Sequence, residues 1–415
     1  RKLEMFDTTL RDGAQTEGIS FSVSDKLAIV KTLDEIGVRY IEAGNPGSNP
    51  KDMEFFRSAN GLQLKNARLV AFGSTKRKNI AARDDANVMS LLEANTDVIA
   101  IFGKSWDLHA TEILNTTLEE NLNCVRETVK FFKGHGKEVI FDAEHFFDGY
   151  ENNPEYAMQV LNAAVEGGAD VLVLCDTNGG TLPMRVYEIV KTVCEKYRGM
   201  RIGIHCHNDA GCAVANSMMA VEAGGCHVQG TFMGIGERCG NADLTTIIPN
   251  LQLKGGYNCI AGSLEQLTET EIKIAELANM TVPKNKPYVG ESAFAHKGGM
   301  HIDGVDKLSR SFEHIDPVCV GNSRKFLLSE VSGKKAVLLK IKDIAPELNK
   351  DSPETAAILE RLKELEHEGY QFEAADASFE LMVKKVIGKF RPHFELSMYK
   401  ASSEHPAPDG ELNSN

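Results

Sequence analysis

Short apolar runs rich in β-branched residues alternate with longer helical patterns from the N-terminus to about residue 253. The run 171–174 is apolar at every position, which is typical of a parallel strand buried on both faces. Helices are predicted in between, for example after the capping residue Ser24 and at 118–133, 154–166 and 184–197. The predicted strands are 3–6, 40–43, 68–72, 98–102, 139–142, 171–174, 201–204 and 228–232.

Strand–helix units that recur about every thirty residues predict a (β/α)₈ barrel over residues 1–255. A doubly wound sheet would need a glycine fingerprint after an early strand. The nearest match, at Gly234, Gly236 and Gly240, has the wrong spacing and comes late in the chain. The fold class predicted is therefore α/β, a barrel followed by smaller, mostly helical subdomains.

The pattern changes beyond residue 255. Ser263 begins a helix that is predicted to run toward Met280, and an irregular stretch rich in glycine and proline follows from 283 to about 322. Two more helices are predicted at 353–367 and 372–387. The expected domains after the barrel are a linker or lid at 256–345, a helical subdomain at 346–400 and a polar tail at 401–415.

Composition fits a globular protein with a sizeable core, since 42% of the 415 residues are hydrophobic and 25% are charged. A net charge of −13 argues against nucleic-acid binding and against a polybasic membrane anchor. No apolar run is long enough for a membrane span, and the N-terminus shows no signal peptide. The nine cysteines include no Cys-x-x-Cys pair, which favours a reducing compartment, and we expect the cytoplasm.

Candidate metal ligands follow the seventh predicted strand. His205 and His207 are two residues apart in extended backbone, so both imidazoles project from one face while Cys206 points away. Two such imidazoles can share a metal ion, although a pair of core histidines is the common alternative. The position favours the metal, because barrel enzymes place their active sites at the carboxyl ends of the strands.

Two further candidates lie near the same place. Asp12 follows the first predicted strand and Asn241 follows the eighth, and closure of a barrel makes these strands neighbours of the seventh. A carboxylate, an amide oxygen and two imidazoles would suit Mg²⁺, Mn²⁺, Zn²⁺ or Fe²⁺. Taken singly, an Asp that caps a helix and an Asn in a turn are ordinary structural residues.

Two longer motifs carry a family resemblance. Residues 7–15, Asp-Thr-Thr-Leu-Arg-Asp-Gly-Ala-Gln, and 205–209, His-Cys-His-Asn-Asp, resemble the signatures of the metal-dependent Claisen-condensing enzymes. These include isopropylmalate, homocitrate and citramalate synthases and the related hydroxymethylglutaryl-CoA lyases. The resemblance covers nearly the whole chain. Further motifs that are most similar to the (R)-citramalate synthase branch lie at 46–52, 141–150, 175–183 and 314–317.

The resemblance implies an acyltransferase that condenses acetyl-CoA with pyruvate and hydrolyses the thioester to give (R)-citramalate, on a route from pyruvate to isoleucine. It implies a homodimer and a divalent metal ion held by Asp12, His205, His207 and Asn241. It also implies that the segment carrying His301 reaches the partner's active site.

Other site residues are implied by the same resemblance. Arg11 would polarise the carbonyl of the keto acid, Glu144 would lie near the acetyl group, and His301 would act in acid–base catalysis. Thr181 would contact the keto-acid carboxylate. Further substrate-binding candidates are Gln15, Glu42 and His109.

The chemistry asks for the same residue types. A 2-keto acid chelates a divalent cation, a guanidinium stabilises the developing alkoxide, and a base must reach the weakly acidic methyl group of acetyl-CoA. Glu144 or His301 would be that base. The plainer alternatives are that Arg11 only pairs with Glu42 or Asp12, and that Glu144 belongs to a structural ion pair.

Three positions depart from the pattern of the branch. Asn45 and Met233 replace a usual Trp and Asn, which leaves the keto acid open, and Phe312 replaces a usual Tyr beside the acid–base groups. The alternatives are 2-isopropylmalate or homocitrate synthesis, a hydroxy-acyl-CoA lyase or aldolase, and a catalytically silent barrel. A regulatory module commonly follows in these synthases, and Asn415 falls about where it would begin. We therefore expect this chain to lack the module and to escape feedback inhibition.

Overall fold

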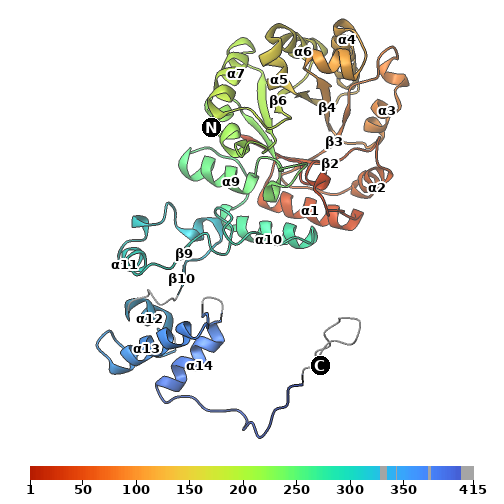
Figure 1. Cartoon of the computed structure of the whole chain (residues 1–415). Coiled ribbons are helices and arrows are strands. Elements are labelled where there is room, and N and C mark those ends of the chain that lie inside the picture. The colour runs from red at the N-terminus through yellow and green to blue at the C-terminus, as the bar shows by residue number, and fades with distance from the viewer. Residues whose placement is uncertain (328–333, 343, 373–374, 403–415) are drawn as a thin grey trace, which may run out of the picture. The chain divides into compact units, whose positions relative to one another are not determined.

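A computed structural model describes residues 1–327, 334–342, 344–372 and 375–402 (Figure 1). The chain forms two compact units. The first comprises Arg1–Phe294 and Ile315–Ser323, and the second comprises Ala295–His314 and the chain from Arg324 onward. The predicted boundaries at 255, 345 and 400 stay predictions.

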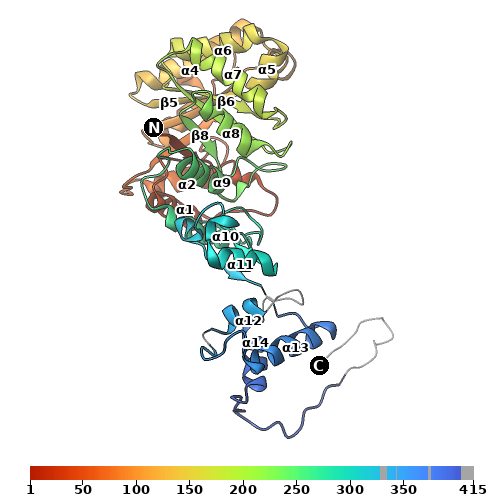
Figure 2. The same cartoon turned by 90° about the vertical axis from the view of Figure 1, so that its left-hand side faces the viewer.

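The first unit is a (β/α)₈ barrel, as the sequence predicted. Within the described residues, eight parallel strands close on themselves in chain order, and helices surround them (Figures 1 and 2). Closure pairs β1 with both β2 and β8, so β1, β7 and β8 are neighbours. The strands are β1 Glu4–Asp7, β2 Tyr40–Gly44, β3 Arg68–Ser74, β4 Val98–Lys104, β5 Glu138–Glu144, β6 Val171–Asp176, β7 Arg201–Cys206 and β8 His227–Gly230.

Several strands continue beyond their predicted ends. The apolar runs stop at 142, 174 and 204, whereas β5, β6 and β7 extend to Glu144, Asp176 and Cys206. The extra residues are polar or form the barrel mouth, so hydropathy alone could not mark them as strand. The predicted eighth strand was too long, because β8 ends at Gly230 and Phe232 begins a short 3-10 turn.

Alternate strand residues fill the inside of the barrel. Phe6, Tyr40, Val70, Val173 and their neighbours form one buried cluster, separate from the larger core between the strands and the surrounding helices. This packing fixes the strand ends, and therefore the side chains of the mouth, on a rigid scaffold.

Helix ends follow capping chemistry. The first helix begins after Ser22, whose hydroxyl accepts from Asp25 N while the Asp25 carboxylate accepts from Ser22 N, so the prediction of Ser24 as the cap was wrong. The helices around the barrel are α1 Val23–Ile36, α2 Pro50–Ala59, α3 Ala86–Glu93, α4 Leu118–Gly134, α5 Phe146–Asn152, α6 Pro154–Gly167, α7 Pro183–Lys196, α8 Ala213–Glu222, α9 Leu244–Pro249 and α10 Leu267–Leu277.

The short turns of this unit include the one that follows the predicted cap Ser263. Its hydroxyl accepts from Glu265 N and starts a 3-10 turn that leads into α10, which ends before Met280. The short turns are η1 Gly13–Gln15, η2 Ala82–Asp84, η3 His109–Ile113, η4 Phe232–Gly234, η5 Asn250–Lys254, η6 Leu264–Gln266 and η8 Pro317–Val320.

The second unit has its own apolar core, which includes Ile302, Val337, Ile358 and Phe379. The prediction of an irregular stretch from 283 to 322 was wrong in part, because this stretch contains a helix. The elements of this unit are β9 Ala295–His296 paired with β10 Lys325–Phe326, α11 Gly299–Lys307, η7 Ser309–Ser311, α12 Lys334–Ile341, α13 Pro353–His367 and α14 Asp376–Val386. Across the described residues, no helix is long and apolar enough to cross a membrane.

Candidate active site

Asp12 stands at the carboxyl end of β1 in a tight turn. The backbone N–H groups of Asp12 and Gly13 both donate to the carbonyl of Thr8, at 2.9 and 3.0 Å. The Asp12 carboxylate makes no capping hydrogen bond to the turn η1 that follows, so the helix-cap alternative does not apply. The side chain is buried and belongs to the barrel mouth.

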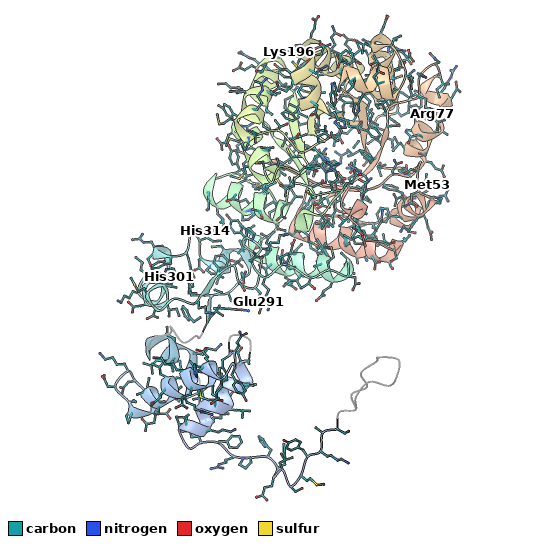
Figure 3. The ribbon with its side chains drawn as sticks, in the orientation of Figure 1. Met53, Arg77, Lys196, Glu291, His301 and His314 are labelled. Carbon is teal, nitrogen blue, oxygen red and sulfur yellow. The ribbon has the colours of Figure 1, made fainter. Side chains whose placement is uncertain are left out.

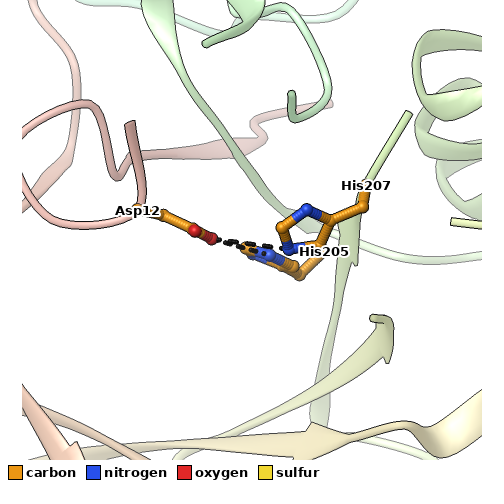
Figure 4. Close-up of side chains that lie close together, drawn as sticks. All are labelled: Asp12, His205 and His207. Carbon is orange, nitrogen blue, oxygen red and sulfur yellow. Dashed lines mark ion pairs between the residues drawn. The ribbon is translucent and has the colours of Figure 1, made fainter. Parts of the chain in front are cut away.

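His205 and His207 face this carboxylate from the end of β7. Nε2 of His205 lies 3.2 Å and Nε2 of His207 lies 3.7 Å from Oδ2 of Asp12 (Figure 4). All three residues are buried, and one ligand atom from each lies within 4.8 Å of the others. The structure therefore brings three of the predicted ligands to one point that could hold a metal ion.

Asn241 lies beside His207, in the loop after β8. Its backbone bridges to that of His207, and its amide is buried. Among the described residues, neither Oδ1 nor Nδ2 of Asn241 has a hydrogen-bond partner. Gly236 permits this arrangement, since a Cβ there would lie 2.7 Å from Oδ1 of Asn241. A buried amide oxygen without a partner fits a fourth ligand of a metal ion.

Protonation suits a cation at two members of this cluster, Asp12 and His207, whereas at His205, although burial opposes it, the Asp12 carboxylate raises the pKa. Burial opposes ionisation of Asp12, but Arg11 and His205 hold the pKa of its carboxyl well below the usual range. Burial and the neighbouring His205 lower the pKa of His207 to about 4, so this imidazole is neutral at physiological pH. Ionised carboxylate and neutral imidazole are the forms that bind divalent cations.

Arg11 reaches over the cluster from the same turn as Asp12. Its Nε donates to Oε1 of Glu42 at 2.6 Å, and its Nη1 lies 3.5 Å from Asp12. The guanidinium carbon stacks 3.7 Å from the centre of the Phe72 ring. Arg11 thus makes both of the ion pairs that the plainer interpretation expected, and it also lines the cavity over the metal candidates.

The cavity over this cluster has a volume of about 220 Å³. One wall is apolar, since Phe72 and Phe102 stack with ring centres 5.3 Å apart. Acids line the cavity as well, and Asp142 is the register neighbour of Phe102 on β5. Burial with the charge of Glu42 raises the pKa of Asp142 to about 7. The lining residues are Arg11, Asp12, Gln15, Phe72, Phe102, Asp142, Glu144, Cys175, Thr177, His205, His207 and Glu237.

Thr177 lines this cavity and was missed from the sequence, whereas Thr181 does not line it. The Thr181 hydroxyl donates to Oδ1 of Asp176 at 2.9 Å, which turns it toward the strand end. A signal for Thr177 was present, because Val173 and Cys175 face the barrel interior and Thr177 continues the same alternation. Glu237 and Asp142 are further lining residues that the sequence analysis did not name.

Of three other predicted site residues, Glu42, Glu144 and His109, only Glu144 lines the cavity. Glu42 is fully buried behind Arg11 and does not line the cavity. Glu144 lines it and forms an ion pair with Lys104, the partnership that the structural alternative proposed. His109 lies outside the lining and stacks on Trp106, with ring centres 5.1 Å apart.

His301 belongs to α11 in the second unit (Figure 3). Its side chain is exposed and stacks on Phe312, with ring centres 4.4 Å apart. Phe312 is one of the three positions that depart from the citramalate synthase pattern. An apolar ring therefore contacts His301 where the pattern would supply a phenol.

Comparison with known proteins agrees with this arrangement. The family described as HMGL-like matches residues 2–281, and a domain described as homocitrate synthase post-HMGL domain-like matches residues 288–370. The chain belongs to the HMGL-like family. Among curated relatives, the (R)-citramalate synthase of Aquifex aeolicus is 54% identical over 400 residues, which cover 96% of this chain and 76% of the relative.

Sequence identity to this chain is higher for a second (R)-citramalate synthase than for a probable 2-isopropylmalate synthase. The (R)-citramalate synthase of Sulfolobus acidocaldarius is 47% identical over 97% of this chain and 77% of its own length. A probable 2-isopropylmalate synthase of Methanopyrus kandleri is 36% identical over 89% of this chain and 70% of its own length. The recognised branch is therefore that of the (R)-citramalate synthases.

A solved structure supports the fold. The hydroxymethylglutaryl-CoA lyase of Bacillus subtilis superposes with a TM-score of 0.58 at 21% identity, and the match covers 68% of this chain and 95% of the lyase. At this identity the likeness shows the barrel fold alone.

Proposed function

We propose that this protein is an acyltransferase that condenses acetyl-CoA with pyruvate and water to give (R)-citramalate and CoA. The observation that carries the proposal is the buried group of Asp12, His205 and His207 beside Arg11, in a chain 54% identical to a curated (R)-citramalate synthase. We further propose that it acts in the cytoplasm on the route to isoleucine.

The proposed metal ligands are Asp12, His205, His207 and Asn241. When bound there, a divalent cation would act as a Lewis acid on the carbonyl of the keto acid. The donor set of one carboxylate, one amide and two imidazoles is compatible with Mg²⁺, Mn²⁺ or Zn²⁺.

Arg11 is proposed to bind and orient the keto acid. Its Nε donates to Glu42 and its Nη1 lies 3.5 Å from Asp12, and the side chain lines the cavity. Glu42 and the Phe72 ring hold the guanidinium plane in place, so the group is oriented before substrate arrives. A fixed guanidinium would stabilise negative charge that develops on the carbonyl oxygen as the new carbon–carbon bond forms.

The shape of the cavity supports a small, apolar keto acid. The stacked rings of Phe72 and Phe102 would face the substituent of the substrate and offer no hydrogen bond to a second carboxylate. This favours pyruvate over a dicarboxylic keto acid such as the substrate of homocitrate synthesis. We expect the Thr177 hydroxyl, rather than that of Thr181, to contact the keto-acid carboxylate, with Gln15 nearby.

Glu144 and His301 are the proposed acid–base groups. Glu144 lines the cavity at the end of β5, within reach of a methyl group placed beside the keto acid. His301 is exposed on α11, and we propose that it enters the active site of the partner in a homodimer. His109 would help to bind the acyl-CoA next to Glu144.

The crossed dimer has a direct test. Inactive Arg11→Ala protein is mixed with inactive His301→Ala protein under conditions of verified subunit exchange. In a crossed dimer, one site of the mixed species has an intact barrel and an intact His301, so activity should partly recover. A mixture that stays inactive would contradict the shared site.

The reaction itself is tested by the release of free thiol from acetyl-CoA against a panel of 2-keto acids. The account expects the highest kcat/KM with pyruvate and a product identified as (R)-citramalate. Turnover with 2-ketoisovalerate or 2-oxoglutarate in place of pyruvate would favour the other synthases. Cleavage of a hydroxy-acyl-CoA without synthesis would favour a lyase.

A further inference from the structure

Gln229 lies inside the barrel next to the proposed metal ligands, and nothing in the proposed reaction uses it. It belongs to β8, and its backbone is the register partner of His205 on β7. The side chain is fully buried and does not line the substrate cavity. A buried amide in this position needs hydrogen-bond partners, and it finds them on two other strands.

The amide oxygen contacts one of the proposed ligands. Oε1 of Gln229 lies 3.0 Å from Nδ1 of His205. An amide oxygen carries no hydrogen, so Nδ1 of His205 must be the protonated nitrogen and the donor. Nε2 of a neutral His205 then keeps its lone pair, and this is the atom that faces Asp12 at 3.2 Å.

The other end of the amide is fixed by an acid across the barrel. Nε2 of Gln229 donates to Oδ1 of Asp142 at 3.0 Å. Asp142 lies on β5, which β6 and β7 separate from β8, so this hydrogen bond spans the interior. Against an ionised Asp142, a flipped amide would place two acceptor oxygens against each other, so the carboxylate form of Asp142 selects the orientation that presents Oε1 to His205.

His207 provides an internal contrast. Its Nδ1 is buried and has no hydrogen-bond partner among the described residues. The two imidazoles of the cluster therefore differ: His205 is oriented through its second nitrogen, whereas the second nitrogen of His207 has no such partner. Groups that orient a ligating imidazole in this way fix its tautomer and raise its basicity.

We propose that Gln229 is a positioning residue that, together with Asp142, holds His205 in the tautomer that ligates a divalent cation. This inference rests on the proposed function, because it takes His205 to be a metal ligand. It adds that metal affinity depends on a residue that touches neither metal nor substrate.

The test is the affinity of purified, metal-stripped protein for Mn²⁺, followed by the electron paramagnetic resonance signal of the free ion. Gln229→Met keeps the length of the side chain and removes both hydrogen bonds. We expect Mn²⁺ binding to weaken about 10- to 100-fold, the range typical of lost partners of ligating histidines. Tyr40→Phe is the matched control, since it also removes a hydrogen bond inside the barrel, to Glu138, and should leave the affinity unchanged.

A rescue separates positioning from packing. The double variant Gln229→Glu with Asp142→Asn reverses the roles of the pair: a carboxylate on β8 would accept from His205 and from an amide on β5. It should bind Mn²⁺ within a few fold of the parent, whereas Gln229→Glu alone places two carboxylates together and should bind less well than the double variant. If Gln229→Met fails to fold, the comparison of the double variant with Gln229→Glu still tests the role of Gln229.

The outcomes are distinct because the titration contains no keto acid and no acetyl-CoA. Parent-like affinity in folded Gln229→Met, or no rescue in a folded double variant, would overturn the role of Gln229 and leave the proposed reaction intact. A parent protein that binds no Mn²⁺ would overturn the metal site and this inference with it.

Discussion

The two ends of the barrel both carry clusters of charged groups, but they use them differently. At the amino-terminal end, Arg201 donates to Glu4 at 3.1 Å and to Glu138 at 2.7 Å, and Tyr40 donates to Glu138 at 2.9 Å. Arg68 also pairs with Glu138. We call this network the barrel floor, and in it each carboxylate has at least one cationic partner.

The barrel mouth has the opposite arrangement. Asp12 shares its single arginine with Glu42 and faces two imidazoles, one of which has its pKa lowered to about 4. The buried amide of Asn241 has no partner among the described residues. At the floor the carboxylates are paired, although Nε2 of the buried His227 also lacks a hydrogen-bond partner among the described residues. The comparison teaches that the floor pairs its acids with cations, whereas the mouth gathers a carboxylate, two imidazoles and an unpaired amide that could receive a ligand.

The largest expected effect is loss of a proposed metal ligand. Asp12→Ala removes the central carboxylate, and activity should fall at least about 1,000-fold together with bound divalent metal, because the ion polarises the carbonyl. Metal is measured by elemental analysis and turnover by thiol release. Glu4→Ala at the floor is the control and should keep both. Full activity with stoichiometric metal in Asp12→Ala would refute the assignment of the mouth.

A smaller loss is expected from Arg11→Lys. This change keeps the charge but loses the planar fork that Glu42 and Phe72 orient. We expect kcat to fall about 100-fold, as for loss of a group that stabilises an oxyanion, while metal content is unchanged. Arg201→Lys is the matched floor variant and should retain kcat. An equal loss of metal in Arg11→Lys would make Arg11 a structural partner of Asp12 instead.

The two threonines after β6 give a paired test. Thr177→Val removes a hydroxyl that lines the cavity and accepts from His145 N at 2.8 Å, which leaves its own hydrogen free to donate. Thr181→Val removes one that donates to Asp176 at 2.9 Å. We expect KM for the keto acid to rise about 10-fold in Thr177→Val, the effect of one hydrogen bond to a charged group, and to stay near the parent value in Thr181→Val. The reverse order of effects would restore Thr181 as the substrate contact.

The smallest effect on turnover is expected from a substitution at the barrel floor, Glu138→Gln, which should change the stability of the fold instead. Although burial opposes it, hydrogen bonds from Arg201, Tyr40 and Arg68 lower the pKa of Glu138 to about 2. A carboxyl with a depressed pKa stabilises the folded state above its unfolded pKa of 4.5, and this contribution is lost as the pH falls toward 2.

Glu138→Gln should therefore lower Tm at neutral pH while kcat is retained. The difference in Tm between parent and variant should narrow as the pH falls from about 5 toward 3, because the parent loses the contribution that the variant never had. Thermal unfolding followed by circular dichroism across this range measures the effect. A difference that is constant with pH would mean that the floor stabilises through packing rather than through charge.

The sequence was informative wherever a local pattern implies a global constraint. Regular strand–helix alternation predicted the barrel, and closure of the barrel predicted that Asp12 meets His205 and His207 from a strand far away in the chain. Residues 353–367 carried a helical pattern strong enough to give the exact bounds of α13.

The sequence was less informative where structure depends on contacts rather than on pattern. Helix α11 begins at Gly299, and the glycines around it read as irregular backbone. The choice between Thr177 and Thr181 depends on which way each hydroxyl turns at a strand end. Gln229 is one polar residue in a short strand, and only the closed barrel shows that it joins His205 to Asp142.

The most direct test of the central claim, that the mouth binds a keto acid on a divalent cation, is a titration of metal-stripped protein with Mn²⁺ in the absence and presence of pyruvate. The account predicts one ion per chain and tighter binding when pyruvate is present, since two ligands that contact each other raise each other's affinity by the same factor. It also predicts that Asp12→Ala abolishes both effects. Mn²⁺ binding that is indifferent to pyruvate, or that survives Asp12→Ala unchanged, would contradict it.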